Sequence, residues 1–163
     1  MCIRDSIQTG GTLDKDYPQI TNGWAFEITT PAFDRILEDL NPNFEWESYS
    51  ACRKDSTEIT GQDRQQLKQL IAECEADKII VTHGTDTMPE TASCLASLTS
   101  KTIVITGAMR PERFSNSDAK INLGMAIAAV QCQPAGVYIA MHGLVIPHNE
   151  IDRNMETGQF KFK

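Results

Sequence analysis

The stretches KIIVT at Lys78–Thr82 and TIVIT at Thr102–Thr106 decide the fold of this chain. Ile, Val and Thr occupy nearly every position in them, which is typical of strands covered on both faces of a parallel sheet. A third stretch of this character, GVYIAM, lies at Gly136–Met141. Because parallel strands need crossover connections between them, the three stretches predict an α/β protein.

The segment between residues 54 and 78 carries clear helix signals. Thr60 can cap a helix, with Asp63 three residues further on to complete the cap. Apolar side chains then recur at the i, i+3, i+4, i+7 spacing of one helix face, at Leu67, Leu70, Ile71 and Cys74. We expect this face to pack on the sheet.

Three other helices are predicted from proline or a polar cap at their start. Pro31 after Thr30 predicts a helix with proline at its first position, and Pro89 predicts a second. Ser117 or Asp118 begins the last one. Its expected packing residues are Ile121, Leu123, Met125, Ile127 and Ala128. The alternation of strands and helices predicts one domain with a mostly parallel, doubly wound sheet and helices on both of its faces.

Charge and hydropathy limit the partners of this chain. Its 22 acidic and 15 basic residues give a net charge of -7 over 163 residues, so phosphate backbones and anionic lipids would on average be repelled. No apolar run reaches the roughly 18 residues of a membrane span, and the first residues lack the apolar stretch of a signal peptide. We expect a cytoplasmic protein with neither nucleic acid nor a membrane as partner.

Cysteine spacing gives no sign of a metal site or a disulfide framework. The five cysteines are odd in number and lack both C-x-x-C spacing and a Cys/His zinc pattern. We interpret them as reduced, buried thiols and expect no bound metal. They are Cys2, Cys52, Cys74, Cys94 and Cys132.

The first six residues do not fit the rest of the pattern. A glycine pair at Gly10-Gly11 should follow a buried apolar strand, whereas residues 1–6 read Met-Cys-Ile-Arg-Asp-Ser. We interpret residues 1–6 as a foreign or damaged terminus and residues 7–163 as the domain. Neither an internal repeat nor a linker divides it.

Polar, glycine-containing loops follow the predicted strands, where ligands bind in doubly wound folds. Gly10-Gly11 alone indicates little more than a tight turn. A His, two Thr and an Asp crowded at residues 83–87 are unusual for a simple connector. Hydroxyls, one carboxylate and exposed backbone amides at such loops can hold a small polar substrate.

Together these loops resemble the asparaginase/glutaminase family. The resemblance lies in TGGT at residues 9–12, DS at 55–56, VTHGTDTMPET at 81–91 and TGAMRP at 106–111, in that order and spacing. It covers nearly the whole chain from Ile7 onward. Family members are commonly about twice this length, with a second domain at the carboxyl end, although short single-domain members exist. The resemblance implies the amino-terminal catalytic domain alone.

The resemblance also implies roles for individual residues. Thr12 is the implied nucleophile, Thr85 belongs to a second catalytic set with Asp86 and a lysine, and Tyr17 is the tyrosine of a mobile loop. A threonine hydroxyl must lose its proton as it attacks, and the developing oxyanion needs fixed donors. The implied substrate-binding residues are Gly11, Ser56, Thr57, Gly84 and Ala108, with Ser56 on the α-carboxylate and Asp86 on the α-amino group. No cofactor is implied, and no glycine or carboxylate motif indicates one.

Two features depart from the family pattern. Arg153 stands where the lysine is expected, and arginine stays protonated, so it can supply charge but cannot act as a base. The second domain is absent from this sequence, which leaves an active-site wall to be supplied by the loop after Thr12 or by a second copy of the chain. His142 and His148, close to Arg153 in sequence, are either solvated loop histidines or alternative bases.

The sequence therefore predicts hydrolysis of the asparagine side-chain amide through a threonyl ester, with glutamine as a second substrate. The alternative is a non-catalytic domain that binds an amino acid, or a fragment or subunit of a larger amidase. We expect a homodimer, because a symmetric copy could cover the open sheet ends. Asparagine and glutamine differ by one methylene, so the sequence does not decide between them.

Overall fold

The computed structural model describes residues 5–17 and 26–163, and within them a six-stranded sheet forms the centre of the molecule. Its strand order is β4-β1-β5-β6-β7-β8. All neighbours pair in parallel except β7 and β8, which are antiparallel. The strands span Asp5–Gly10 (β1), Glu47–Lys54 (β4), Lys78–Thr82 (β5), Thr102–Thr106 (β6), Gly136–Met141 (β7) and Leu144–Pro147 (β8).

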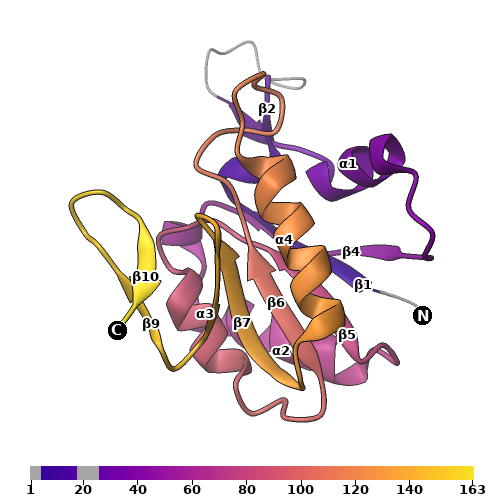
Figure 1. Cartoon of the computed structure of the whole chain (residues 1–163), viewed down its shortest axis with the longest axis vertical. Coiled ribbons are helices and arrows are strands. Elements are labelled where there is room, and N and C mark those ends of the chain that lie inside the picture. The colour runs from indigo at the N-terminus through magenta and orange to yellow at the C-terminus, as the bar shows by residue number, and fades with distance from the viewer. Residues whose placement is uncertain (1–4, 18–25) are drawn as a thin grey trace.

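Four helices cover the two faces of this sheet (Figure 1). They are α1 (Ala32–Leu40), α2 (Gly61–Glu73), α3 (Met88–Leu95) and α4 (Ala119–Cys132). One apolar core contains side chains of α1 and α4, and the other contains side chains of α2 and α3. Ile79 and Val81 point into the second core while Ile80 points into the first, because alternate residues of a strand face opposite ways. The predicted doubly wound architecture is confirmed.

The three strands predicted from β-branched stretches have the bounds expected for them. The capping box of α2 is also confirmed. The Asp63 amide donates to the Thr60 hydroxyl at 3.2 Å, and the Thr60 amide donates to the Asp63 carboxylate at 2.8 Å. Leu67 and Ile71 of the predicted face are buried, and Leu70 and Cys74 pack against the same core.

The other helix starts differ in detail from the prediction. Pro31 is the cap of α1 rather than its first residue, because the helix begins at Ala32, whose amide is held by a buried carboxylate. Pro89 lies in the first turn of α3, after Met88. Asp118, not Ser117, is the cap of α4.

Two predictions about packing are wrong. Ile121 is 69% exposed and Ala128 is exposed as well, because the buried side of α4 runs through Ala126 and the correctly predicted Leu123 and Ile127. The cysteines that the structure describes are not fully buried either. Those in the described part of the chain are free thiols, and Cys132 is exposed while the others are only partly buried.

Smaller elements surround the sheet. The strands β2 (Lys15–Asp16) and β3 (Glu27–Ile28) pair next to the end of β1, and β9 (Ile151–Arg153) and β10 (Phe160–Phe162) form a hairpin beside β8. Figure 1 shows this hairpin projecting from the sheet at the end of the chain. All six residues of β1 are buried, including Asp5 and Ser6. None of the described helices is long and apolar enough to cross a membrane.

A buried carboxylate ties the end of β1 to α1. Asp14 is fully buried in the 3-10 turn η1 (Thr12–Asp14), and its carboxylate accepts the Ala32 amide at 2.7 Å. A negative charge at a helix N-terminus is favourable, but burial disfavours ionisation. Burial dominates and raises the pKa of Asp14 to about 6, against the lowering effect of the Ala32 amide.

We predict that Asp14→Asn changes how stability depends on pH. The stability contributed by protonated Asp14 is fully present below about pH 4 and is lost as the pH rises through 6, since its folded pKa lies above the unfolded value. Asparagine does not titrate. The unfolding free energy of the variant minus that of wild type should therefore rise by about 3 kcal/mol between pH 4 and pH 7, at about 1.4 kcal/mol per pKa unit. Urea unfolding at several pH values measures it, and a difference independent of pH would contradict it.

Candidate functional site

The loops after β1, β4, β5 and β6 meet at the carboxyl edge of the sheet. The loop after β1 turns through two glycines in the left-handed region, with φ of 107° at Gly10 and 89° at Gly11. A Cβ on Gly10 would lie 2.6 Å from the Lys54 carbonyl oxygen at the end of β4. The Gly11 amide donates to the same carbonyl at 3.1 Å. Both glycines are therefore required by conformation and by space.

Backbone contact continues from this turn to the loops after β5 and β4. A Cβ on Gly11 would lie 2.4 Å from the Cα of Gly84, and a Cβ on Gly84 would lie 2.7 Å from the Ser56 hydroxyl oxygen. No side chain fits between these three residues, which we call the glycine junction. Thr12 follows Gly11 and Thr85 follows Gly84, so the junction brings the two predicted catalytic threonines onto adjoining loops.

Hydrogen bonds hold Ser56 against the turn that carries Asp86. The Asp86 amide donates to the Ser56 hydroxyl at 3.2 Å, and the Thr87 hydroxyl donates to the Ser56 carbonyl at 2.7 Å. Ser56 is almost fully buried, whereas Asp86 is exposed. Because the Ser56 oxygen accepts the amide hydrogen, its own proton remains available for an anionic ligand.

An ion pair links the loop after β1 to the loop after β4. The Lys15 ammonium lies 3.0 Å from the Asp55 carboxylate, and the Asp55 carboxylate also accepts the Thr57 amide. The hydrogen bond from Lys15 is the main reason that the pKa of Asp55 is lowered. The predicted binding residue Thr57 is exposed, and its hydroxyl is directed to Asp55.

Arg153 reaches the site from the β9–β10 hairpin. Its guanidinium lies 3.0 Å from the Asp86 carboxylate, and its Nε donates to the Gly158 carbonyl at 3.2 Å. The guanidinium carbon also lies 5.5 Å from the centre of the Phe160 ring, within range of a cation–π contact. The Arg153 side chain is 15% exposed. Three contacts thus hold a fixed positive charge beside Asp86.

The loop after β6 is held from the start of α4. The Asp118 carboxylate accepts the Met109 amide at 3.0 Å and the Arg110 amide at 3.1 Å, and the Asn122 side chain donates to the Gly107 carbonyl at 3.0 Å. A Cβ on Gly107 would lie 2.3 Å from the His83 carbonyl oxygen, so this loop also packs on the loop after β5. The predicted binding residue Ala108 is buried between these contacts.

His83 is a buried histidine behind the glycine junction. Its Nδ1 lies 2.7 Å from the Gly84 carbonyl oxygen, and its Nε2 lies 2.8 Å from the Thr91 hydroxyl. Burial lowers the pKa of His83 to about 4, so the ring is neutral at physiological pH. The stability gained from the neutral ring is present above about pH 6.5 and is lost as the pH falls toward 4.

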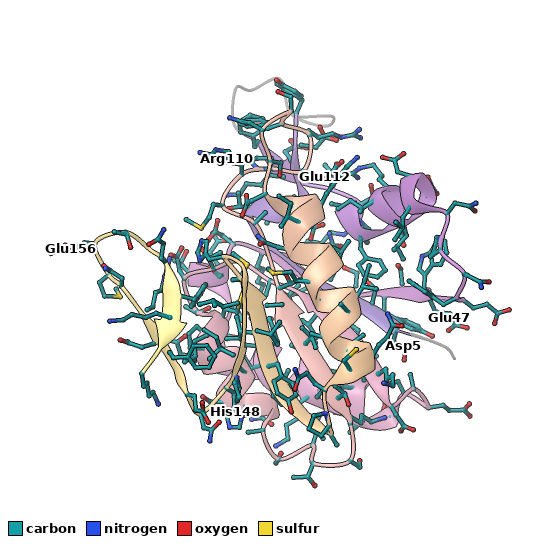
Figure 2. The ribbon with its side chains drawn as sticks, in the orientation of Figure 1. Asp5, Glu47, Arg110, Glu112, His148 and Glu156 are labelled. Atoms are coloured by element: carbon teal, nitrogen blue, oxygen red, sulfur yellow. The ribbon has the colours of Figure 1, made fainter. Side chains whose placement is uncertain are left out.

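Among the described residues, three other candidates make no hydrogen bond or ring contact with the glycine junction. Tyr17 is 66% exposed and its ring contacts Phe26, while part of the loop assigned to it lies outside the described residues. His142 accepts the Phe160 amide at 3.2 Å beneath the hairpin. His148 lies next to Val137 at the opposite, amino end of β7, far from Arg110 and Glu112 in Figure 2. His148 is therefore excluded as a base at this site.

Sequence reasoning missed two side chains, Thr91 and Asp118, that hold the loops through hydrogen bonds from α3 and from the start of α4. Thr91 is the last residue of the motif at residues 81–91 and has no predicted role of its own, and Asp118 is predicted only as a helix start. The available indication was their position, since Thr91 ends the motif at 81–91 and Asp118 follows the motif at 106–111. A cavity of about 760 Å³ between Trp46, Tyr49 and Cys74 lies at the amino end of the sheet and not at this site.

Comparison with known proteins agrees with the fold and the loop motifs. Residues 6–162 match the family model described as Asparaginase, N-terminal. A glutaminase-asparaginase of Pseudomonas aeruginosa is 32% identical over 171 residues, which cover 95% of this chain and 47% of that protein. The thermostable L-asparaginase from Thermococcus kodakarensis superposes with a TM-score of 0.81 at 25% identity, over 98% of this chain and 50% of its own.

A further relative has a different function in its name. A glutamyl-tRNA(Gln) amidotransferase polypeptide of Methanococcus vannielii is 40% identical over 70 residues, which are 42% of this chain and 16% of that protein. The chain spans about half the length of the glutaminase-asparaginases that it matches.

We predict that Gly84→Ala disrupts the glycine junction. The new Cβ would meet the Ser56 side chain at 2.7 Å, and such overpacking costs about 1–3 kcal/mol of unfolding free energy. Gly124→Ala in α4 is the matched control, because its Cβ meets nothing within 4 Å. That control should gain about 0.5–1 kcal/mol, as expected for alanine in a helix. Equal stability of the two variants in thermal unfolding would show that the close contact does not exist.

Proposed function

Because the chain belongs to the asparaginase family by its match to the amino-terminal domain, we propose that it hydrolyses the side-chain amide of L-asparagine to L-aspartate and ammonia. The glycine junction is the observation that carries this proposal. It places the loop of Thr12 against the loop of Thr85 and Asp86, and both against Ser56. The residues that we propose as nucleophile and as binding groups for the two ends of an amino acid would thus lie at one edge of the sheet.

Ser56 and Asp86 suit the charged end of an amino acid. The Ser56 hydroxyl has a proton free to donate to an α-carboxylate, and Asp86 has a carboxylate oxygen beyond the one paired with Arg153. The amide of the substrate would then extend toward Thr12. The binding roles of Gly11, Gly84 and Ala108 would be carried by their backbone groups, since these residues have no polar side chain.

The proposed reaction runs through a threonyl ester. The Thr12 oxygen attacks the amide carbon and loses its proton as the C–O bond forms. The tetrahedral oxyanion collapses, the C–N bond breaks and the nitrogen leaves as ammonia with that proton. Water then attacks the ester carbon, which releases aspartate and restores the Thr12 hydroxyl. Backbone amides around Gly11, Thr12 and Thr85 would stabilise both oxyanions.

Arg153 would act in this reaction as a fixed charge. It stays protonated, so it cannot take the proton from Thr12 or from the Thr85 hydroxyl. Its contacts with Gly158 and Phe160 hold it on Asp86, which it orients. Tyr17, five residues after Thr12, remains the proposed partner for proton transfer from the loop side. A second copy of the chain, as a homodimer, would cover the open edge of the site.

A second candidate function is supported by the match to an amidotransferase polypeptide. The chain would then form part of a larger amidase and would bind an amino acid without hydrolysing it efficiently alone. The partly exposed site and the arginine beside Asp86 are compatible with this function. Asparagine binding without ammonia release by the isolated chain would favour it over the hydrolase.

We predict that Thr12→Ala abolishes ammonia release from asparagine. Loss of the nucleophile should lower kcat by about a thousandfold or more, because no covalent intermediate can form. Thr12→Ser should keep part of the activity. The melting temperature should stay near that of wild type, since Thr12 is only half-buried. A coupled ammonia assay measures this, and unchanged turnover in the alanine variant would exclude Thr12 as the nucleophile.

We predict that Arg153→Lys raises turnover more than it changes affinity. A lysine beside Asp86 can exchange a proton in the transition state, whereas both cations attract the ground state similarly. Acid–base catalysis typically contributes about 100-fold or more to kcat, so a gain of about tenfold corresponds to partial restoration. Ammonia release and asparagine affinity are measured side by side for both proteins. A clearly active wild type with no gain in the variant would show that arginine suffices.

A further inference from the structure

We infer that Arg64, Thr91 and His83 are positioning residues that fix the peptide between Gly84 and Thr85, so that the Thr85 amide faces the loop of Thr12. This inference rests on the proposed function, in which that amide stabilises the oxyanion. None of the three side chains would contact the substrate. They form a line from α2 through α3 to the loop after β5.

The two ends of this line determine the donor and acceptor in each hydrogen bond, because the Gly84 carbonyl can only accept and Arg64 can only donate. The Gly84 carbonyl can only accept, so His83 Nδ1 must carry the hydrogen. In the neutral ring Nε2 then has no hydrogen and must accept from the Thr91 hydroxyl, 2.8 Å away. The Thr91 oxygen in turn accepts from Arg64 Nε at 3.0 Å. Arginine cannot accept a hydrogen bond, so the line has only one arrangement.

The Gly84 carbonyl and the Thr85 amide belong to the same planar peptide, so fixing the direction of one also fixes the direction of the other. The peptide is trans, like every peptide bond in the described residues, so its C=O and N–H point in opposite directions. The Gly84 carbonyl points to the buried ring of His83. The Thr85 amide therefore points away from the ring. Gly11 and Ser56 pack on the preceding residue, Gly84, so we infer that the amide faces their side. Within residues 5–17 and 26–163, no group accepts a hydrogen bond from it.

Glycine makes this support necessary. Gly84 can rotate more freely than any residue with a Cβ, and a larger residue would clash with Ser56. A buried hydrogen bond from a stiff ring can restrain that rotation without occupying space in the site. His83 and Thr91 have no exposed surface, so water does not compete for the bonds. Arg64 is further anchored by a bond of 3.1 Å to the Ile59 carbonyl.

The test removes the middle of the line and preserves its shape. Thr91→Val deletes the hydroxyl with little change in volume, and Thr91→Ser restores it. Tyr138→Phe is the matched control, because it deletes another largely buried hydroxyl, which donates to the Pro134 carbonyl near the amino end of β7. We would measure kcat and KM for ammonia release, and nitrogen NMR of the His83 ring and the Thr85 amide.

We expect Thr91→Val to lower kcat by about tenfold with KM within about twofold, since a misdirected oxyanion donor affects the transition state most. Thr91→Ser should recover most of the loss. NMR should show Nδ1–H in wild type and a more mobile Thr85 amide in Thr91→Val. Equal kcat in Thr91→Val and Tyr138→Phe, with the Thr85 amide unchanged, would overturn the inference.

Two outcomes separate this inference from the proposed function. If wild type releases no ammonia from asparagine or glutamine, the hydrolase proposal fails, and the Thr85 amide signal alone decides whether the line positions the peptide.

If Thr91→Val does not fold, His83→Asn and His83→Leu replace it. Asparagine can still donate to the Gly84 carbonyl, so it should retain more order at the Thr85 amide than leucine does. Equal disorder in both would overturn the inference.

Discussion

The close backbone contact at the glycine junction is the constraint on which the site depends. Gly11, Gly84 and Ser56 approach so closely that a methyl group on either glycine would overlap its neighbour. The parallel sheet supplies the approach, because β1, β4 and β5 are adjacent and their carboxyl ends leave the sheet at the same edge. The glycines allow this close contact between the loops. The hydroxyls of Thr12 and Ser56 and the carboxylate of Asp86 can come near one another only because the loops that carry them are in contact.

Two ion pairs further fix the loops around the glycine junction. Lys15 pairs with Asp55 between the first two loops, and Arg153 pairs with Asp86 from the hairpin at the end of the chain. Both pairs are partly exposed, so each contributes little to stability. Their effect is to determine which carboxylate oxygens remain available to bind a ligand. One oxygen of Asp86 is taken by the guanidinium, and the other remains open to a ligand.

Two buried titratable groups support the loops from inside the fold. His83 and Asp14 both have pKa values shifted by burial, down to about 4 and up to about 6. Each fixes a backbone group beside the junction, since His83 bonds to the Gly84 carbonyl and Asp14 accepts the Ala32 amide. Their effects on stability oppose one another between pH 4 and pH 6.

The sequence by itself determined the architecture and the loops that matter. The β-branched stretches at Lys78–Thr82 and Thr102–Thr106 and the Thr60 cap are local patterns, and local patterns are sufficient to specify strands, helices and the edge where their loops meet. Only the tertiary structure decided what those loops contact. The Arg153–Asp86 pair spans 67 residues and the His83–Thr91–Arg64 line joins three elements, so their partners depend on packing rather than on spacing. The exposure of Ile121 was missed for the same reason, because an apolar residue on α4 is buried only where another element covers it.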